Sequence, residues 1–281
     1  MGVLNVTPDS FSDGGEHLAL ERAVARVVEM IAEGASVVDV GGESTRPGAL
    51  PVDPTEEQAR VIPVLEAIAE PCERAGVRRS IDTRNPATAR AAVAAGATLI
   101  NDVSASLWAV AAEVGAGWVA MHMAGDPRTM QADPHYDDVV DDVRRFLAGR
   151  AGMALAAGVG EVWVDPGIGF GKTTAHNVAL LAHLDLLVGD GLPVVVGTSR
   201  KRSLGVLLAR ADAGADPHPG PPGGRAYFDD VSPVDLADRV DGSLATATWA
   251  MIQGARMLRA HDVGVTAQAA TIVAGAAGQE V

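Results

Sequence analysis

The sequence predicts a (β/α)₈ TIM barrel, an α/β fold. Its 281 residues are close to the ~250 that are typical of this barrel. Short runs rich in β-branched residues alternate with longer Ala-rich segments along nearly the whole chain. Apolar runs such as the one at 194–196 are typical of parallel strands covered on both faces. An open doubly wound sheet is the alternative architecture.

The alternation resolves into strand-then-helix units. Glycine just past a helical pattern marks several helix ends, as at Gly34, Gly76 and Gly96. The strands are predicted near residues 2–6, 36–40, 79–83, 98–103, 118–122, 161–165, 193–198 and 257–261. The helices are predicted near 18–33, 55–75, 86–95, 107–114, 137–157, 174–189, 203–209 and 233–254, with a last one near 265–274.

Proline and glycine are concentrated between residues 211 and 230, where Pro217, Pro219, Pro221 and Pro222 fall within a few residues of one another. We predict a flexible excursion there, between the seventh strand unit and the eighth helix, rather than a domain boundary. Residues 1–281 are therefore expected to form a single domain. Because Gly2 already belongs to the first predicted strand, the start is expected to be truncated or misassigned, or to lack a small segment that closes the barrel bottom.

Composition and charge exclude several classes of protein. Hydrophobic residues make up 48% and charged residues 21% of the chain, which is too apolar for a disordered protein. The net charge of −14 argues against nucleic-acid binding, which needs a basic face. No apolar run reaches the about 18 residues of a membrane span, and because no basic-then-apolar stretch stands at the start, no signal segment is expected. Cys72 is the single cysteine, so a disulfide framework is excluded and a cytoplasmic location without a membrane partner is expected.

Polar residues collect at one end of the predicted strands. Catalytic and binding groups of such barrels lie where strands end and the following loops begin, and polar groups are costly to bury unpaired. The polar residues at the strand ends are, in chain order, Asn5, Glu43 to Arg46, Asp82, Asn101, Asp102, His122, Asp165, Ser199 to Lys201, and Arg259 with His261 and Asp262. Their equivalent positions predict a ring of converging groups that binds a ligand.

The residue types in this ring indicate what it binds. Asp82, Asn101 and Asp165 offer acceptors and one amide donor, a set that suits a flat heterocycle with several N–H groups. Side chains expected to be positive come from three further strand ends and suit a diphosphate or a carboxylate. They are Arg46, Lys201, Arg259 and His261.

Familiar phosphate, zinc and hydrolase motifs are absent from the sequence. The stretch GIGFGKT at 167–173 is similar to a P-loop, but Pro166 stands where that motif requires glycine. Lys172 takes the place of the third glycine of a dinucleotide fingerprint, and no role is predicted for it. There is no His-Glu-x-x-His pair, which argues against a protein-held zinc, and no Gly-x-Ser-x-Gly elbow.

An ordered set of motifs resembles the dihydropteroate synthases, the folate-pathway enzymes of the pterin-binding barrel family. The matching stretches are MGVLNVTPDSFSDGG at 1–15, DVGGESTRPG at 39–48, SIDT at 80–83, INDVS at 100–104, MHM at 121–123, DPGIGFGK at 165–172, SRKR at 199–202 and RAHDV at 259–263. Each is weak alone, but together they cover all the predicted strand ends and are highly specific.

The resemblance implies a transferase that joins para-aminobenzoate to 6-hydroxymethyl-7,8-dihydropterin diphosphate. The products are 7,8-dihydropteroate and diphosphate, and Mg²⁺ is the implied cofactor. The resemblance also implies a homodimer and inhibition by sulfonamides, which imitate para-aminobenzoate.

Roles for individual residues follow from the same resemblance. The pterin would be held by Asp82, Asn101, Met121, Asp165 and Lys201. The aminobenzoate and diphosphate would be met by Phe11, Thr45, Arg46, Pro47, Phe170, Ser199, Arg259 and His261. Asn5 would be a ligand of Mg²⁺, and the catalytic residues would be Asp13, Arg46, Asp165 and Lys201.

Two other readings of the motifs stay open at this point. A pterin-dependent methyltransferase uses a similar barrel, but it needs neither an aminobenzoate pocket nor a diphosphate site. Phe11, the stretch at 45–47 and the stretch at 199–201 therefore favour the synthase. A catalytically lapsed paralogue would bind pterin without turnover. The presence of Asn5, Arg46, Lys201 and Arg259 argues against it.

Overall fold

The computed structural model describes residues 1–7, 15–44, 48–214 and 231–278. Five residues with predicted roles lie outside this part of the chain: Phe11, Asp13, Thr45, Arg46 and Pro47. Most of the predicted excursion, residues 215–230, also lies outside it. At the start of that excursion the prediction is wrong, because helix α9 (Arg202–Asp212) continues through residues 211 and 212.

The strands are parallel and pair in the order of the chain. The six-stranded sheet contains β1 (Gly2–Asn5), β2 (Val37–Gly41), β3 (Arg78–Asp82), β4 (Leu99–Asp102), β5 (Gly117–Met121) and β6 (Val162–Asp165). A second sheet pairs β7 (Val195–Val196) with β8 (Met257–Leu258).

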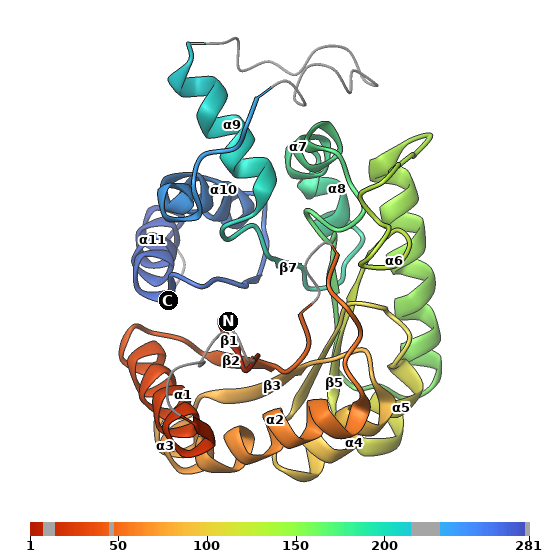
Figure 1. Ribbon diagram of the computed structural model, residues 1–281. Helices are drawn as coiled ribbons and strands as arrows, with labels where there is room; N and C mark the ends of the chain where they lie inside the picture. The colour runs from red at the N-terminus through yellow and green to blue at the C-terminus, as the bar shows by residue number, and fades with distance from the viewer. Residues whose placement is uncertain (8–14, 45–47, 215–230, 279–281) are drawn as a thin grey trace.

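Two bridges join these sheets into a closed ring. Gly2 pairs in parallel with Ala260, and Val164 pairs with Val194. The Val3 amide donates to the Ala260 carbonyl at 3.1 Å, which links β1 to the segment that follows β8. The ring of strands and the helices around it (Figure 1) confirm the predicted (β/α)₈ barrel.

The helices follow the strands as expected, with different bounds in several places. They are α1 (Gly15–Ala32), α2 (Pro54–Ala67), α3 (Ala69–Ala75), α4 (Pro86–Ala94), α5 (Trp108–Val114), α6 (Val139–Ala156), α7 (Thr174–Ala182), α8 (Leu184–Gly189), α9, α10 (Val240–Ile252) and α11 (Val263–Ala276). A 3₁₀ turn, η3 (Leu236–Arg239), precedes α10.

Two helices predicted as continuous are each divided. The segment predicted at 55–75 breaks at Ile68 between α2 and α3. Pro71 has no N–H to donate to the carbonyl four residues earlier, so the hydrogen-bond ladder is interrupted there. The segment predicted at 174–189 breaks at His183 between α7 and α8.

The barrel interior changes from apolar to polar along the strand direction. Val37, Leu99, Val119 and Val195 form a buried cluster separate from the core that packs the strands against the helices. Strand side chains alternate between the two faces of the sheet. Asp39, two residues beyond Val37, therefore points into the same interior but nearer the carboxyl ends of the strands.

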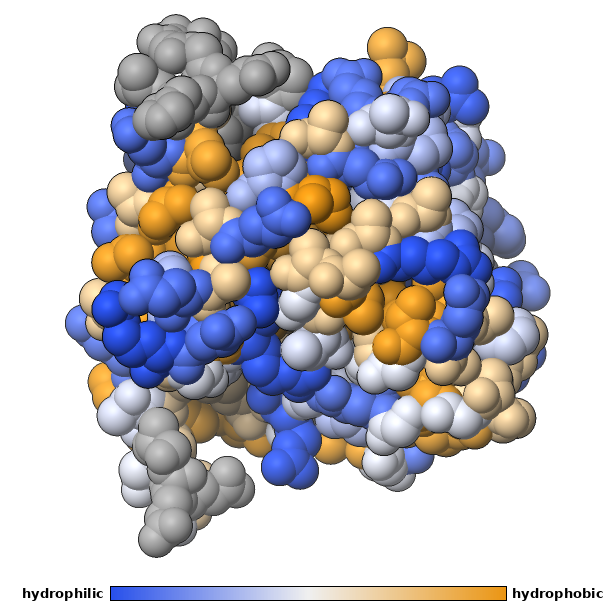
Figure 2. All heavy atoms as spheres, turned by 90° about the horizontal axis from the view of Figure 1, so that it is seen from below, coloured by the Kyte–Doolittle hydropathy of each residue, from blue (hydrophilic) through white to orange (hydrophobic). Residues whose placement is uncertain are grey.

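The outer surface mixes polar and apolar residues. On the face that carries α2 and α4, hydrophilic and hydrophobic patches are interspersed (Figure 2). Among the described residues, no helix has the length and apolar character needed to cross a membrane.

Candidate functional site

An arginine and two aspartates meet inside the barrel at the carboxyl ends of the strands. Arg259 follows β8, and its Nε lies 2.7 Å from Asp39 Oδ2 on β2. Its Nη2 lies 2.7 Å from Asp82 Oδ2 on β3. Asn101 on β4 donates from Nδ2 to Asp39 Oδ2 at 2.9 Å. This cluster joins residues 220 positions apart in the chain.

Burial makes the charges of this cluster sensitive to pH and to a ligand. Burial and the nearby Asp39 carboxylate raise the pKa of Asp82 to about 7, against the opposing charge of Arg259. Asp39 is fully buried, and its Oδ1 has no hydrogen-bond partner among the described residues. The cluster therefore keeps acceptor capacity that an N–H group of a ligand could use.

Asp165, the last residue of β6, lies in the same interior. It is almost fully buried, and Oδ1 accepts a hydrogen bond from the Gly167 amide at 2.7 Å. Burial raises the pKa of Asp165, whereas the Gly167 amide and the positive side chains of Lys201 and Arg259 lower it. Met121, at the end of β5, is paired in register with Asp165 and is also buried.

Lys201 reaches the site from the beginning of α9. Its Nζ lies 3.9 Å from the centroid of the Phe170 ring, close enough for a cation–π interaction. Gly169 has a φ of 82°, and a Cβ at this position would lie 3.1 Å from Lys201 Cδ. The glycine is therefore needed both for its backbone conformation and for the path of the lysine side chain.

His261 and Ser199 contact each other after β8 and β7. The Ser199 hydroxyl lies 3.1 Å from His261 Nδ1 and accepts from the His261 amide at 3.1 Å. Burial and the nearby positive charges of Arg259 and Arg200 lower the pKa of His261 to about 4. The expectation that His261 supplies positive charge is wrong for the free protein near pH 7, where the ring is neutral and acts as a hydrogen-bonding group.

Asn5 ends β1 beside the cluster. Its side-chain amide has no hydrogen-bond partner within the described part of the chain. Across the described ranges, no group of three or more His, Cys, Asp or Glu residues could hold a metal. A full protein cage for a metal is thus not built from these residues, but Mg²⁺ is often held by one or two protein oxygens together with substrate phosphates and water. Asn5 fits that kind of site.

Asp102 is buried next to the site residue Asn101 but has a structural role. Its carboxylate accepts from the Ser104 hydroxyl and the amides of Ser104, Ser106 and Leu107, and also from Trp118 Nε1. These donors fix the loop after β4, so little acceptor capacity is left for a ligand.

The loop after β2 is held on both sides of the residues predicted to meet aminobenzoate. Before them, the buried Glu43 carboxylate lies 2.7 Å from Arg84 Nη2. After them, the Gly48 amide donates to the Pro127 carbonyl at 3.1 Å. Thr45, Arg46 and Pro47 themselves lie outside the described residues.

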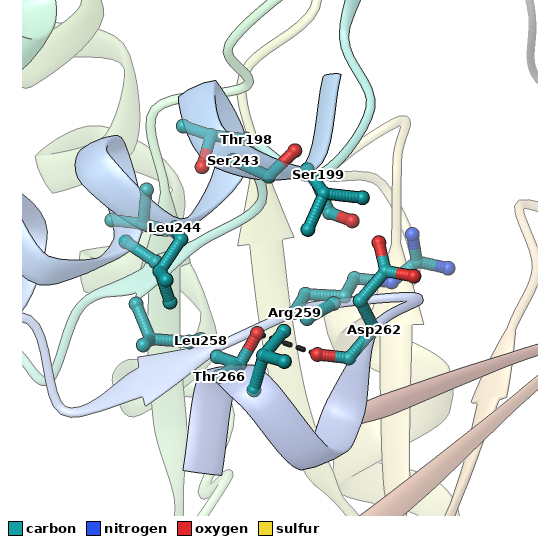
Figure 3. Close-up of a pocket in the computed structure, with 13 residues that line it drawn as sticks. Thr198, Ser199, Ser243, Leu244, Leu258, Arg259, Asp262 and Thr266 are labelled. Atoms are coloured by element: carbon teal, nitrogen blue, oxygen red, sulfur yellow. Dashed lines mark hydrogen bonds between the residues drawn. The ribbon is translucent and has the colours of Figure 1, made fainter. Parts of the chain in front are cut away.

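A narrow cavity lies behind the barrel wall, between β7, β8, α10 and α11. Leu244, Leu258 and Thr266 surround it together with the inner side of Ser199 (Figure 3). Its volume of about 10 Å³ holds at most one water molecule. Ser199 and Arg259 line this cavity, but Asp82 and Asp165 do not, so the barrel mouth is the candidate ligand site.

The predicted site residues that the structure describes gather in the mouth: Asp82, Asn101, Met121, Asp165, Phe170, Ser199, Lys201, Arg259 and His261, with Asn5 at the end of β1. The sequence reasoning missed Asp39. A detectable signal existed, because Asp39 is a lone carboxylate in an apolar strand, two residues from Val37 and from Gly41. It also missed the contact between Lys172 and His122, whose atoms Nζ and Nδ1 are 2.9 Å apart.

The family model for pterin-binding enzymes matches residues 1–261. This chain belongs to the pterin-binding enzyme family. The dihydropteroate synthase of Escherichia coli (strain K12) is 43% identical over 279 residues, covering 97% of this chain and 89% of the relative. That of Mycobacterium leprae (strain TN) is 44% identical over 285 residues, covering 97% and 91%.

Solved structures of the family superpose closely on this chain. Dihydropteroate synthase from Yersinia pestis, in complex with a sulfonamide drug, has a TM-score of 0.83 at 41% identity and covers 99% of this chain and 93% of its own. The enzyme from Xanthomonas albilineans with 4-aminobenzoic acid has the same TM-score at 43% identity, with the same coverage. A structure of the Xanthomonas albilineans enzyme with 7,8-dihydropteroate has a TM-score of 0.80 at 40% identity, covering 99% and 93%.

Proposed function

We propose that this chain is a dihydropteroate synthase, a transferase of folate synthesis. The carrying observation is the mouth itself, where Asp39, Asp82, Asn101, Asp165 and Arg259 converge in a chain that matches such enzymes over nearly its full length. In the reaction, the C–O bond between the dihydropterin methylene and diphosphate breaks. A C–N bond to the aminobenzoate nitrogen forms, and that nitrogen loses a proton.

The buried polar groups suit the pterin ring. Asp82 and Asp165 accept from ring N–H and amino groups, and Asn101 can both donate and accept. Asp82 has a pKa of about 7 in the free protein, so both its forms are present near neutral pH. Hydrogen bonds donated by the ligand favour the ionised form. The Met121 side chain provides apolar contact next to these groups.

Diphosphate departure leaves positive charge on the pterin methylene. The Asp165 carboxylate is placed to stabilise that charge, and Asp13 is proposed to join it from the first loop. Arg259, together with Arg46, is proposed to bind the leaving diphosphate, and neutral His261 donates a hydrogen bond to it. Lys201 Nζ lies 3.9 Å from the centroid of the Phe170 ring, and we propose that Lys201 contacts the pterin and Phe170 the aminobenzoate.

The neutral aniline nitrogen is already a usable nucleophile, so the reaction needs no strong general base. We propose an SN1-like course in which the loops near 6–15 and 41–49 close and exclude water. Under conditions where chemistry limits the rate, the rate is expected to be insensitive to the nucleophilicity of substituted aminobenzoates. A strong dependence on nucleophilicity would contradict this course.

Mg²⁺ is the proposed cofactor, with Asn5 as its protein ligand. When bound, Mg²⁺ neutralises charge on the diphosphate and so makes it a better leaving group. The Asn5 carbonyl oxygen would orient the diphosphate relative to Arg259. Product formation is expected to stop when a chelator is added and to return with excess Mg²⁺.

Diphosphate release tests the proposed activity directly. Purified protein is given dihydropterin diphosphate, para-aminobenzoate and Mg²⁺, beside a Lys201→Ala variant. We expect release that requires both substrates and falls about 10²- to 10³-fold in the variant, the usual cost of removing an electrostatic group from a site. If folded protein binds the pterin and makes no product, it is a lapsed paralogue. If it binds neither substrate, the proposed function is wrong.

A homodimer is also proposed, with α10 and α11 as the contacting surface. These adjacent helices expose the large apolar side chains Trp249, Ile252, Val265 and Ile272, and such a cluster on a helix pair favours a partner surface. Light scattering after gel filtration is expected to give twice the mass of 28.8 kDa, and Ile272→Glu is expected to reduce it to the single-chain value. A cytoplasmic location and inhibition by sulfonamides complete the proposal.

A further inference from the structure

Lys172 is a buried lysine that has no role in the proposed reaction. It is 3% exposed, in the loop between β6 and α7. Its Nζ lies 2.9 Å from His122 Nδ1, 3.0 Å from the Gly167 carbonyl and 3.0 Å from the Phe170 carbonyl. The His122 carbonyl lies 3.3 Å away. Burial lowers the pKa of Lys172 to about 7. The protonated form donates three hydrogen bonds to these four acceptors, whereas the neutral amine donates only two.

The contact with the Gly167 carbonyl links Lys172 to Asp165. The Gly167 carbonyl accepts from Lys172, and the Gly167 amide donates to Asp165 Oδ1 at 2.7 Å. Lys172 also acts on Asp165 through its charge, which lowers the pKa of that buried carboxyl. Lys172 therefore contacts the peptide that hydrogen-bonds Asp165, and its charge adds to those of Lys201 and Arg259 in lowering the pKa of that carboxyl.

The contact with the Phe170 carbonyl links Lys172 to Phe170 and Lys201. The Phe170 carbonyl accepts from Lys172, while the Phe170 ring lies under Lys201 Nζ. The peptide that carries this ring is thus hydrogen-bonded to one lysine and its side chain contacts the other. A shift of the peptide would move the ring and alter the place of Lys201.

Glycine residues and side chains from other parts of the chain both contribute to the shape of this loop. Gly167, Gly169 and Gly171 all have positive φ. Other side chains hold the remainder of the loop: Gln131 donates to the Gly169 carbonyl at 2.8 Å, and Tyr136 donates to the Gly171 carbonyl at 2.7 Å. Lys172 alone among these donors contacts the carbonyls of Gly167 and Phe170.

We propose that Lys172 is a positioning residue that aligns Asp165 and the Phe170–Lys201 pair for the two substrates. It does not touch substrate. It acts through the peptide groups of Gly167 and Phe170. One buried side chain therefore fixes the positions of groups in both the pterin and the aminobenzoate subsites. This inference rests on the proposed function.

The test compares Lys172→Met with Tyr136→Phe, which removes one hydrogen bond to the same loop and leaves the carbonyls of Gly167 and Phe170 alone. Equilibrium binding of dihydropterin diphosphate and the aminobenzoate KM are measured beside the thermal midpoint. In Lys172→Met we expect both constants to worsen about 10- to 100-fold, the size expected for lost hydrogen bonds to a charged group. In Tyr136→Phe we expect changes below about threefold. If both variants lose binding only in step with their loss of thermal stability, Lys172 is merely structural.

Chemical rescue separates the hydrogen bonds from general packing. Lys172→Ala leaves a space for a small amine, and ethylammonium is expected to restore part of the pterin affinity. Tetramethylammonium carries the same charge but cannot donate, and it is expected to have no effect. Equal rescue by both ions, or by neither while the variant remains folded, would overturn the proposal.

A measurement on the unmodified protein covers the case in which the variants do not fold. Lys172 and Lys201 are the only lysines of the chain, so ¹⁵N-lysine labelling gives two side-chain signals. We expect a slowly exchanging ammonium signal for Lys172 that shifts when dihydropterin diphosphate is added. A signal that the ligand leaves unchanged would contradict the inference. If the wild-type protein forms no dihydropteroate, the proposed function fails, while pterin binding still tests the role of Lys172.

Discussion

The two ends of the barrel hold charged groups in opposite ways. At the amino end of the strands, Arg78 on β3 makes a bidentate pair with Glu161, with both distances at 2.8 Å. Glu161 also accepts from Trp163 Nε1 at 2.7 Å. At the carboxyl end, Arg259 is shared between Asp39 and Asp82, and Asp39 keeps an oxygen without a partner among the described residues.

The difference shows what each end contributes. The Arg78–Glu161 pair is matched in charge and in geometry, so a ligand has little to gain there. The mouth contains more carboxylates than its arginine can satisfy, and burial raises the pKa of Asp82 and of Asp165. Such incomplete pairing costs stability in the free protein. A ligand with N–H donors can supply the missing hydrogen bonds to these carboxylates.

The largest effect is expected when the mouth loses its shared cation. Arg259→Met leaves Asp39 and Asp82 buried without their common partner, which is strongly destabilising for a buried ion pair, at about 3–5 kcal/mol. Product formation is expected to fall at least about 10²-fold. Urea unfolding monitored by circular dichroism, and kcat/KM, check the two parts. An unchanged free energy of unfolding would contradict the view that the mouth is held by this one guanidinium.

A smaller loss is expected when only the missed carboxylate is changed. Asp39→Asn keeps the shape but removes the charge that pairs with Arg259 at 2.7 Å. Hydrogen bonds to charged groups contribute about 1.5–3 kcal/mol, so kcat/KM is expected to fall about 10- to 100-fold. The fold should persist, which far-UV circular dichroism verifies. Asp39→Asn is also expected to lower the pKa of Asp82, because Asp39 raises it in the native protein.

The pH dependence of the mouth depends on Asp82. Its pKa is about 7 in the folded protein and 3.8 as the ordinary value, so the folded state binds the proton more tightly. The stability that Asp82 contributes is therefore fully present below pH about 4 and is lost as pH rises to 7. Urea unfolding of the wild type and of Asp82→Asn should diverge over this window, with the wild type losing stability relative to the variant as pH rises.

Ligand binding should show the opposite trend over the same pH range. A pterin that donates to Asp82 favours the ionised carboxylate, so its affinity should increase from pH 6 to 8. Fluorescence titration of the pterin at several pH values measures this. Affinity that stays flat in the wild type would show that Asp82 is not the titrating contact.

The smallest effect is expected at the amino end of the barrel. Arg78 and Glu161 have side chains 36% and 37% exposed, so solvent screens their attraction, and Arg78→Gln should cost about 1 kcal/mol or less. This corresponds to a fall in the thermal midpoint of roughly 2–4 °C. The kcat/KM value should remain that of the wild type. A large loss of activity in this variant would mean that the two ends are coupled.

Much of the candidate site could be predicted because the signal is local and periodic. Polar residues such as Asn101 and Asp165 interrupt apolar strands, and the alternation of strand side chains places them in the interior. The neutral state of His261 could not be predicted, because its lowered pKa depends on burial and on Arg259. The break at Ile68 left a signal in Pro71, whereas the break at His183 left none that we can identify.

The sequence by itself determined the barrel, the end of the strands at which the candidate site residues gather, and the family to which the chain belongs. Only the tertiary structure decided which charges are paired. Ring closure brings β8 beside β1, and this allows Arg259 to reach Asp39 across 220 positions of the chain. Folding also buries Lys172 against His122. The physical reason is that strand and helix patterns repeat over a few residues, whereas charge states depend on burial and on neighbours that come together only when the ring closes.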